Sequence, residues 1–233
     1  MAQRGGIHQS APVYFRDRVD AGAQLAAMLD AFRDEDALVL GIPHGGVPVA
    51  AEVARRLLGE LNIVVARKLG AHGHEELAIG AVTANGGQYL NTHLIHELMV
   101  PQDYIDEVIE KQRAEARRQE ETLRGSVPRP HIAGRLVIVV DDGLATGATA
   151  RAALRSIRKQ QPARLILAVP VGARETCEAL QPEVDEVVCL SQPADFFAVS
   201  LWYRHFEPVP DREVQRLVVA ANATDVLQHR QYD

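Results

Sequence analysis

A single stretch, residues 136–149, constrains the fold of this chain more than any other. It reads Leu-Val-Ile-Val-Val-Asp-Asp-Gly-Leu-Ala-Thr-Gly-Ala-Thr. Five apolar, mostly β-branched residues in a row predict a strand that is buried on both faces, as strands of a parallel sheet are. The run stops at two adjacent carboxylates, Asp141 and Asp142, and a helical pattern begins at about residue 150. The stretch therefore favours an α/β fold in which helices flank the sheet.

The turn between this strand and this helix has the composition of a phosphate-binding loop. It consists of small or hydroxyl-bearing residues, namely Ala145, Thr146, Gly147, Ala148 and Thr149. Backbone N–H groups and the positive end of the helix dipole can converge on an anion there. The two carboxylates ahead of the loop are suited to bind vicinal hydroxyls or a divalent cation. A sugar phosphate carries both a phosphate for the loop and hydroxyls for the carboxylates. The alternative is an ordinary turn whose acids cap the helix.

Strand and helix patterns alternate along the rest of the chain. Further strands are predicted at residues 37–42, 61–66, 164–170 and 186–190. Helices are predicted at about residues 21–32, 49–58, 102–123, 150–159, 175–180 and 211–221. This order predicts a doubly wound, mostly parallel sheet in one domain spanning residues 1–233. Its core covers about residues 14–190, and a small C-terminal hood and the last helix cover about residues 191–233.

The segment from Val139 to Thr149 resembles the phosphoribosyl-pyrophosphate (PRPP) signature of the type I phosphoribosyltransferases. The string Glu-Leu-Ala-Ile-Gly-Ala, which follows Arg67-Lys68, is also similar to an uncharacterised bacterial branch of that family. The resemblance implies transfer of a 5-phosphoribosyl group from PRPP to a small nitrogen-containing acceptor, with Mg²⁺ as cofactor and pyrophosphate as product. A PRPP- or nucleotide-sensing regulator that binds without turnover is the alternative from another class.

The resemblance also distributes roles over the signature. Asp141 and Asp142 are expected to bind the ribose hydroxyls and the Mg²⁺ ion, and the loop at residues 145–149 the 5-phosphate. Enzymes that act on 6-oxopurines usually carry an aspartate where this chain has Ala145. Its absence argues against a hypoxanthine- or guanine-type acceptor and leaves adenine, orotate, uracil and non-nucleobase acceptors open.

Two further sets of residues are candidates for the pyrophosphate. His44, Gly45 and Gly46 follow the first predicted strand, and the glycines let backbone N–H groups approach an anion closely. They stand where the family binds pyrophosphate, although relatives tend to carry Arg in place of His44. Arg67 and Lys68, at the predicted end of the second strand, are candidates to neutralise the diphosphate, with Lys68 as a catalytic group. A structural Gly-Gly turn and a solvated pair of cations are the alternatives.

Three other side chains complete the candidate site. Family members place a mobile loop near the glycine-rich residues 70–87, and Glu76 in that segment is a candidate site carboxylate. The family's hood supplies a platform for the base, for which Phe197 and Trp202 are candidates; core packing is the alternative for each. Arg16 and Arg18, ahead of the first helix, are interpreted as surface residues rather than as residues that lean over the site.

Charge and composition limit the partners. Asp and Glu outnumber Lys and Arg by 31 to 25, whereas a nucleic-acid-binding surface needs a concentrated basic face. Cys177 and Cys189 show neither metal-ligand spacing nor a disulfide framework. No signal region and no apolar run of about 18 residues is found, so we expect a cytoplasmic protein without a membrane partner. The helix at residues 102–123 becomes polar on all sides past Lys111, which predicts that it projects into solvent or against a partner subunit in a homodimer.

Overall fold

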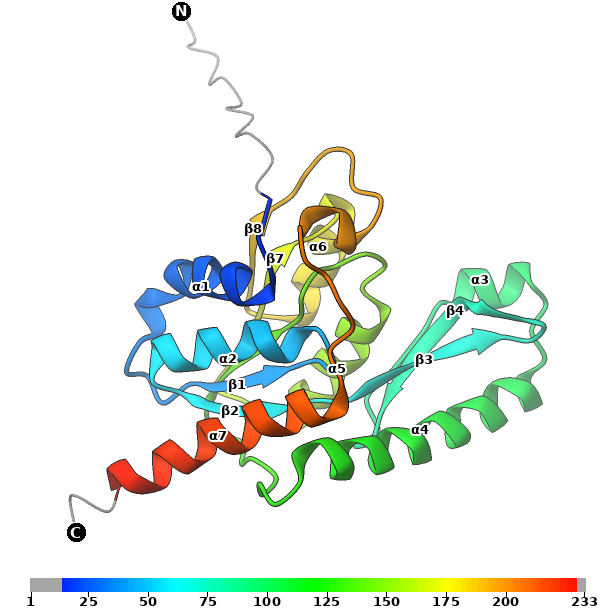
Figure 1. Ribbon diagram of the computed structural model, residues 1–233. Coiled ribbons are helices and arrows are strands. Elements are labelled where there is room, and N and C mark those ends of the chain that lie inside the picture. Colours follow the sequence, from blue (N-terminus) through cyan, green and yellow to red (C-terminus); the bar gives the residue numbers. More distant parts are fainter. Residues whose placement is uncertain (1–13, 230–233) are drawn as a thin grey trace, which may run out of the picture.

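The computed structural model describes residues 14–229, without the side chains of Glu75, Glu76 and residues 224–229. Within these residues, five strands form a sheet whose neighbours are all parallel (Figure 1). In spatial order they are β2 (Glu60–Ile63), β1 (Leu38–Gly41), β6 (Leu136–Val140), β7 (Arg164–Val171) and β8 (Glu186–Ser191). The predicted doubly wound, mostly parallel sheet is confirmed.

Strand β6 shows why its apolar run is continuous. Val137 and Val139 pack in a core cluster with α5 (Ala148–Arg158) and α6 (Arg174–Leu180) on one face of the sheet. Ile138 and Val140 pack on the other face with α1 (Arg18–Met28) and α2 (Gly46–Leu57). Successive side chains of a strand point to opposite faces, so covering both faces requires an apolar residue at every position.

The strand order places a crevice between β1 and β6. These strands pair in parallel, with Gly41 opposite Val140 at their carboxyl ends. Strand β1 continues through α2 to β2 on one side, whereas β6 continues through α5 to β7 on the other. The two connections diverge at this point, and ligands of open α/β sheets bind where they do so.

A second sheet forms an arm that extends from the parallel sheet (Figure 1). It is antiparallel and consists of β3 (Ala66–Ala71), β4 (His74–Thr83) and β5 (Gln88–Leu90), with α3 (Thr92–Glu97) and α4 (Gln102–Arg124) beside it. Two expectations from the sequence are therefore wrong. Strand β2 ends at Ile63, so Arg67 and Lys68 lie inside β3, and much of the glycine-rich segment forms strands. Leu69 and Ile79 of this sheet pack against Ile105 of α4, which explains why these strands form.

The polar half of α4 packs within the molecule. Ala116 and Leu123 are buried in a cluster with Val214 and Val218 of α7 (Asp211–His229). Glu120 and Arg124 are also buried, and they form an ion pair with one another. This half of the helix therefore does not project into solvent as expected, because α7 covers it; a homodimer stays a prediction.

The hood consists of residues 193–206 and includes a short 3-10 helix at Val199–Trp202. The chain near the N-terminus completes it, because Phe15 forms a parallel bridge with Tyr203. Helix α7 lies away from the hood, where it packs against β2, α2 and α4 (Figure 1). None of the helices within residues 14–229 is long and apolar enough to span a bilayer.

Candidate active site

The loops that follow β1 and β6 meet in the crevice between these strands. A Cβ atom on Gly45 would overlap Asp142 Oδ2, and one on Gly46 would lie 2.7 Å from the carbonyl oxygen of Val140. The peptide bond between Pro43 and His44 is cis. Only glycines allow the backbone of the first loop to approach the acidic pair so closely. The structure thus brings together two sets of residues that the sequence separates by about one hundred positions.

The acidic pair lies at the centre of this crevice. Asp141 Oδ1 accepts a hydrogen bond from the backbone N–H of Asp142 at 2.9 Å. Burial raises the pKa of Asp141 well above its usual range, and the adjacent Asp142 raises it further. Burial also raises the pKa of Asp142, but the hydrogen bond from Arg18 opposes that rise. The pair therefore binds a proton more readily than two exposed carboxylates, and Asp141 is the preferred position for it.

Arg18 is a site residue that the sequence interpretation missed. Its Nε donates to Asp142 Oδ2 at 2.8 Å, and its Nη1 donates to the carbonyl oxygen of Glu207 at 2.9 Å. The guanidinium group also lies over the Phe206 ring, 3.8 Å from the ring centroid. Arg16, by contrast, is exposed as expected. No local pattern signals this difference, because every one of these contacts of Arg18 comes from a distant part of the chain.

Tyr203 supports the acidic pair from the hood. Its hydroxyl donates to the backbone carbonyl oxygen of Asp142 at 2.6 Å. Burial raises the pKa of Tyr203, and Asp142 adds to the rise, so the hydroxyl keeps its proton. Tyr203 therefore fixes the backbone of the acidic pair.

Hydrogen bonds to α6 and β7 hold the loop after β6, which is the predicted phosphate-binding loop. The backbone N–H of Leu144 donates to the carbonyl oxygen of Val171, and Thr176 Oγ1 donates to the carbonyl oxygen of Ala145 at 2.6 Å. Gly147 has a φ of +70°, which favours glycine, and it precedes the first residue of α5. Among the described residues, no side chain caps this helix end. The loop therefore presents free backbone N–H groups at the positive end of an 11-residue helix.

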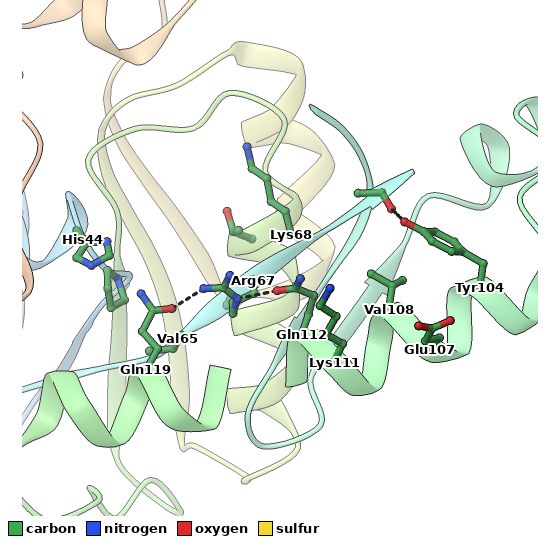
Figure 2. Close-up of a pocket in the computed structure, with 14 residues that line it drawn as sticks. His44, Val65, Arg67, Lys68, Tyr104, Glu107, Val108, Lys111, Gln112 and Gln119 are labelled. Atoms are coloured by element: carbon green, nitrogen blue, oxygen red, sulfur yellow. Dashed lines mark hydrogen bonds between the residues drawn. The ribbon is translucent and has the colours of Figure 1, made fainter. Parts of the chain in front are cut away.

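A cavity of about 550 Å³ adjoins the first loop, between β3 and α4 (Figure 2). Arg67 lies at its centre, where Nε donates to Gln112 Oε1 at 2.7 Å and Nη1 donates to Gln119 Oε1 at 3.0 Å. The side chains that line the cavity also include His44, Val65, Lys68, Tyr104, Glu107, Val108, Lys111 and Thr149. The predicted cations Arg67 and Lys68 thus line the same space as His44 of the predicted pyrophosphate loop, although they reach it from the second sheet.

His44 connects the first loop to the last helix. Its Nε2 lies 2.8 Å from Oδ1 of Asp211, the first residue of α7. This contact holds the imidazole at the border between the crevice and the cavity. The sequence places His44 where relatives tend to carry Arg, but no local pattern predicts its contact with Asp211, which lies 167 positions away.

The remaining candidates have different positions. Glu76 lies on β4, and its side chain is outside the described part of the chain. Phe197 is 84% exposed on the hood. Trp202 is only 7% exposed, belongs to the hydrophobic cluster of the hood and stacks on Tyr14 with ring centroids 5.4 Å apart. Its burial favours the packing alternative, whereas Phe197 stays a predicted contact of the acceptor.

Comparison with known proteins agrees with this arrangement. A family model for the phosphoribosyl transferase domain matches residues 17–203. Two proteins of Mycobacterium tuberculosis, from strains CDC 1551 and H37Rv, are named as candidate phosphoribosyl transferases, and each is 42% identical over 200 residues. These matches cover 86% of this chain but 45% of each relative, so the chain spans about half the length of the curated relatives it matches.

A solved structure has the same fold as this chain over nearly the whole length of the solved protein. The crystal structure of the protein TT1426 from Thermus thermophilus is 42% identical and superposes with a TM-score of 0.76. The superposition covers 89% of this chain and 99% of that one. With the family model matching most of its length, the chain belongs to the phosphoribosyl transferase domain family.

Proposed function

We propose that this protein transfers a 5-phosphoribosyl group from PRPP to a nitrogen acceptor and releases pyrophosphate. One observation carries the proposal: three structures that suit the three parts of PRPP meet at one crevice. These structures are the free N-terminal end of α5, the acidic pair, and the glycine loop with its cationic neighbours. PRPP carries a 5-phosphate, a ribose diol and a diphosphate in the corresponding order.

Each part of PRPP would be bound by one of these three structures. Backbone N–H groups of residues 145–149 would bind the 5-phosphate, and the hydroxyls of Thr146 and Thr149 would assist them. Asp141 and Asp142 would accept hydrogen bonds from the ribose hydroxyls. The diphosphate would lie against Gly45 and Gly46 and extend toward the cations of the cavity.

Magnesium is compatible with the acidic pair. The ion usually keeps several waters and binds through one or two carboxylates together with substrate phosphates. Asp141 and Asp142 would supply the carboxylates, and within the described residues no cluster of three or more His, Cys, Asp or Glu side chains forms a protein-only metal site. When bound, Mg²⁺ would supply positive charge that offsets the charge of the departing diphosphate.

The residues support a dissociative transfer. As the bond between C1 and the diphosphate oxygen breaks, the ribose develops oxocarbenium character, so catalysis needs a fixed sugar, a neutralised leaving group and little water. Arg18 fixes the carboxylate of Asp142 and favours its ionised form, which accepts hydrogen bonds and does not donate them. Lys68 would balance the charge of the leaving pyrophosphate from β3.

One loop residue restricts the class of acceptor. Ala145 is exposed at the position where 6-oxopurine enzymes of the family usually carry an aspartate. Without that carboxylate, the loop has no group to handle the purine proton. We therefore propose an acceptor other than hypoxanthine or guanine, with Phe197 as a candidate contact.

Thermal shift and product release test the proposal. Mg-PRPP should raise the melting temperature of the wild type, and Asp142→Asn should abolish the shift because the amide weakens binding to the ribose diol and the metal. No shift in the wild type would refute PRPP as the donor. A panel of nucleobases and amines should then reveal pyrophosphate release with one acceptor class. Absence of pyrophosphate release with every acceptor of the panel, although PRPP binds, would favour a sensor over a transferase.

A further inference from the structure

The lysines of this chain are unevenly distributed. The sequence contains three, at positions 68, 111 and 159, and two of them line the cavity between β3 and α4. Neither Lys68 nor Lys111 has an ion-pair or hydrogen-bond partner among the described residues. Glu107 also lines the cavity, four residues before Lys111, but these two side chains do not form an ion pair. Figure 2 shows Lys111 on the cavity side of α4.

The hydrogen-bond partners of the third cation of the cavity, Arg67, are uncharged, and Glu115, the nearby carboxylate on α4, hydrogen-bonds to Arg118 instead. Arg67 donates to the side-chain oxygens of Gln112 and Gln119, which carry no charge. Carboxylates at these positions would fix the guanidinium equally well, but they would cancel its charge. Two amides instead orient a full positive charge toward the same space as the two lysines, and an anion is the ligand that such an arrangement favours.

The cavity is long. Its lining runs along α4 from Tyr104 to Gln119, a helix length of about 22 Å at 1.5 Å per residue. The space is therefore elongated as well as cationic.

We propose that the cavity between β3 and α4 is an oligophosphate-binding site in which Lys111 is a binding residue beside Arg67 and Lys68. The ligand class is a linear phosphate chain that runs from His44 along α4. The chain has two possible sources: the diphosphate of PRPP, or a separate nucleoside triphosphate. The inference rests on the proposed function only where PRPP is the source.

Calorimetric titration with inorganic tripolyphosphate and with pyrophosphate tests the site directly. Lys111→Met should weaken tripolyphosphate binding about tenfold or more, with a shallower salt dependence, because one cation that binds the phosphates is lost. Lys159→Met is the matched control: this lysine donates to the carbonyl oxygen of Gly86 at 2.9 Å and lies outside the cavity lining. It should leave the affinity within twofold. An unchanged melting temperature of each unliganded variant would show that both remain folded.

The outcomes separate this inference from the proposed function. Absence of tripolyphosphate binding to the wild type, or equal affinity of the wild type and Lys111→Met, would overturn the inference, whatever PRPP does. Binding that depends on Lys111 but occurs in a protein to which PRPP does not bind would support the site and refute the donor. Displacement of tripolyphosphate by PRPP would identify PRPP as the source, whereas ATP binding that depends on Lys111 in the presence of saturating PRPP would identify a nucleotide.

Discussion

Arg18 and Asp142 form an ion pair between side chains that are 11% and 15% exposed, with Arg18 Nε 2.8 Å from Asp142 Oδ2. The two residues are 124 positions apart in the chain and come from the start of α1 and the loop after β6. The ion pair ties the first helix to the acidic pair of the crevice. It also makes the two aspartates unequal, because Arg18 hydrogen-bonds to the carboxylate of Asp142 and not to that of Asp141.

Removing this cation should destabilise the protein through the carboxylate it leaves behind. Arg18→Met keeps a long side chain against Phe206 but leaves Asp142 largely buried without a partner, which costs up to about 3–5 kcal/mol in the free energy of unfolding. Asp142→Asn in the same chain should recover part of the loss. Denaturant unfolding of the two single variants and the double variant measures the coupling. Additive effects would show that the pair contributes no specific interaction.

The raised pKa of Asp141 predicts a pH-dependent gain in stability for Asp141→Asn. The folded state favours the protonated carboxyl, so its stabilising effect is present below the unfolded pKa of about 3.8 and is lost as pH rises through the higher folded pKa. Each unit of the rise corresponds to about 1.4 kcal/mol, or roughly 3–6 °C in melting temperature for a chain of this size. The variant should melt above the wild type at pH 8 and with it at pH 3.5. Equal melting temperatures at pH 8 would contradict the raised pKa.

Gly45 should tolerate a methyl group only when the acidic pair is altered. Gly45→Ala places Cβ onto Asp142 Oδ2 and 2.9 Å from Arg18 Nε, so we expect a loss of about 1–3 kcal/mol in unfolding free energy. In an Asp142→Ala background the carboxylate is absent and the same substitution should have a much smaller effect. The cycle is measured by denaturant unfolding. A penalty of equal size in both backgrounds would place the conflict elsewhere.

Two aromatic residues of the hood should separate into a packing residue and a contact residue. Trp202→Ala should lower the unfolding free energy by about 3–5 kcal/mol, because a buried indole leaves a cavity beside Tyr14. Phe197→Ala should change stability by less than about 0.5 kcal/mol, since its ring is exposed. Once an acceptor is known, Phe197→Ala should raise its KM. An unchanged KM would remove Phe197 from the acceptor site.

Local sequence pattern is sufficient to predict those elements whose formation depends on near neighbours. The chain around Asp141 predicts a strand, a loop and a helix start from its apolar run, its small residues and its helical pattern. These signals are local, because hydrophobic pattern, backbone freedom and helix propensity act between near neighbours. The same reasoning identified His44, Gly45 and Gly46 as a second loop. A parallel sheet then requires that loops at the ends of neighbouring strands share one edge.

Contacts between distant residues depend on tertiary packing, which local pattern does not predict. The run Ile63-Val64-Val65 is apolar throughout, so nothing local marks where the chain leaves one sheet for the other. The sequence therefore predicts Arg67 and Lys68 at the end of the second parallel strand, whereas they lie inside β3. The polar half of α4 is covered by α7, and Arg18 is covered by the acidic pair and the hood. In each case burial is a property of the partner surface, which lies far away in the sequence and becomes adjacent only when the chain folds.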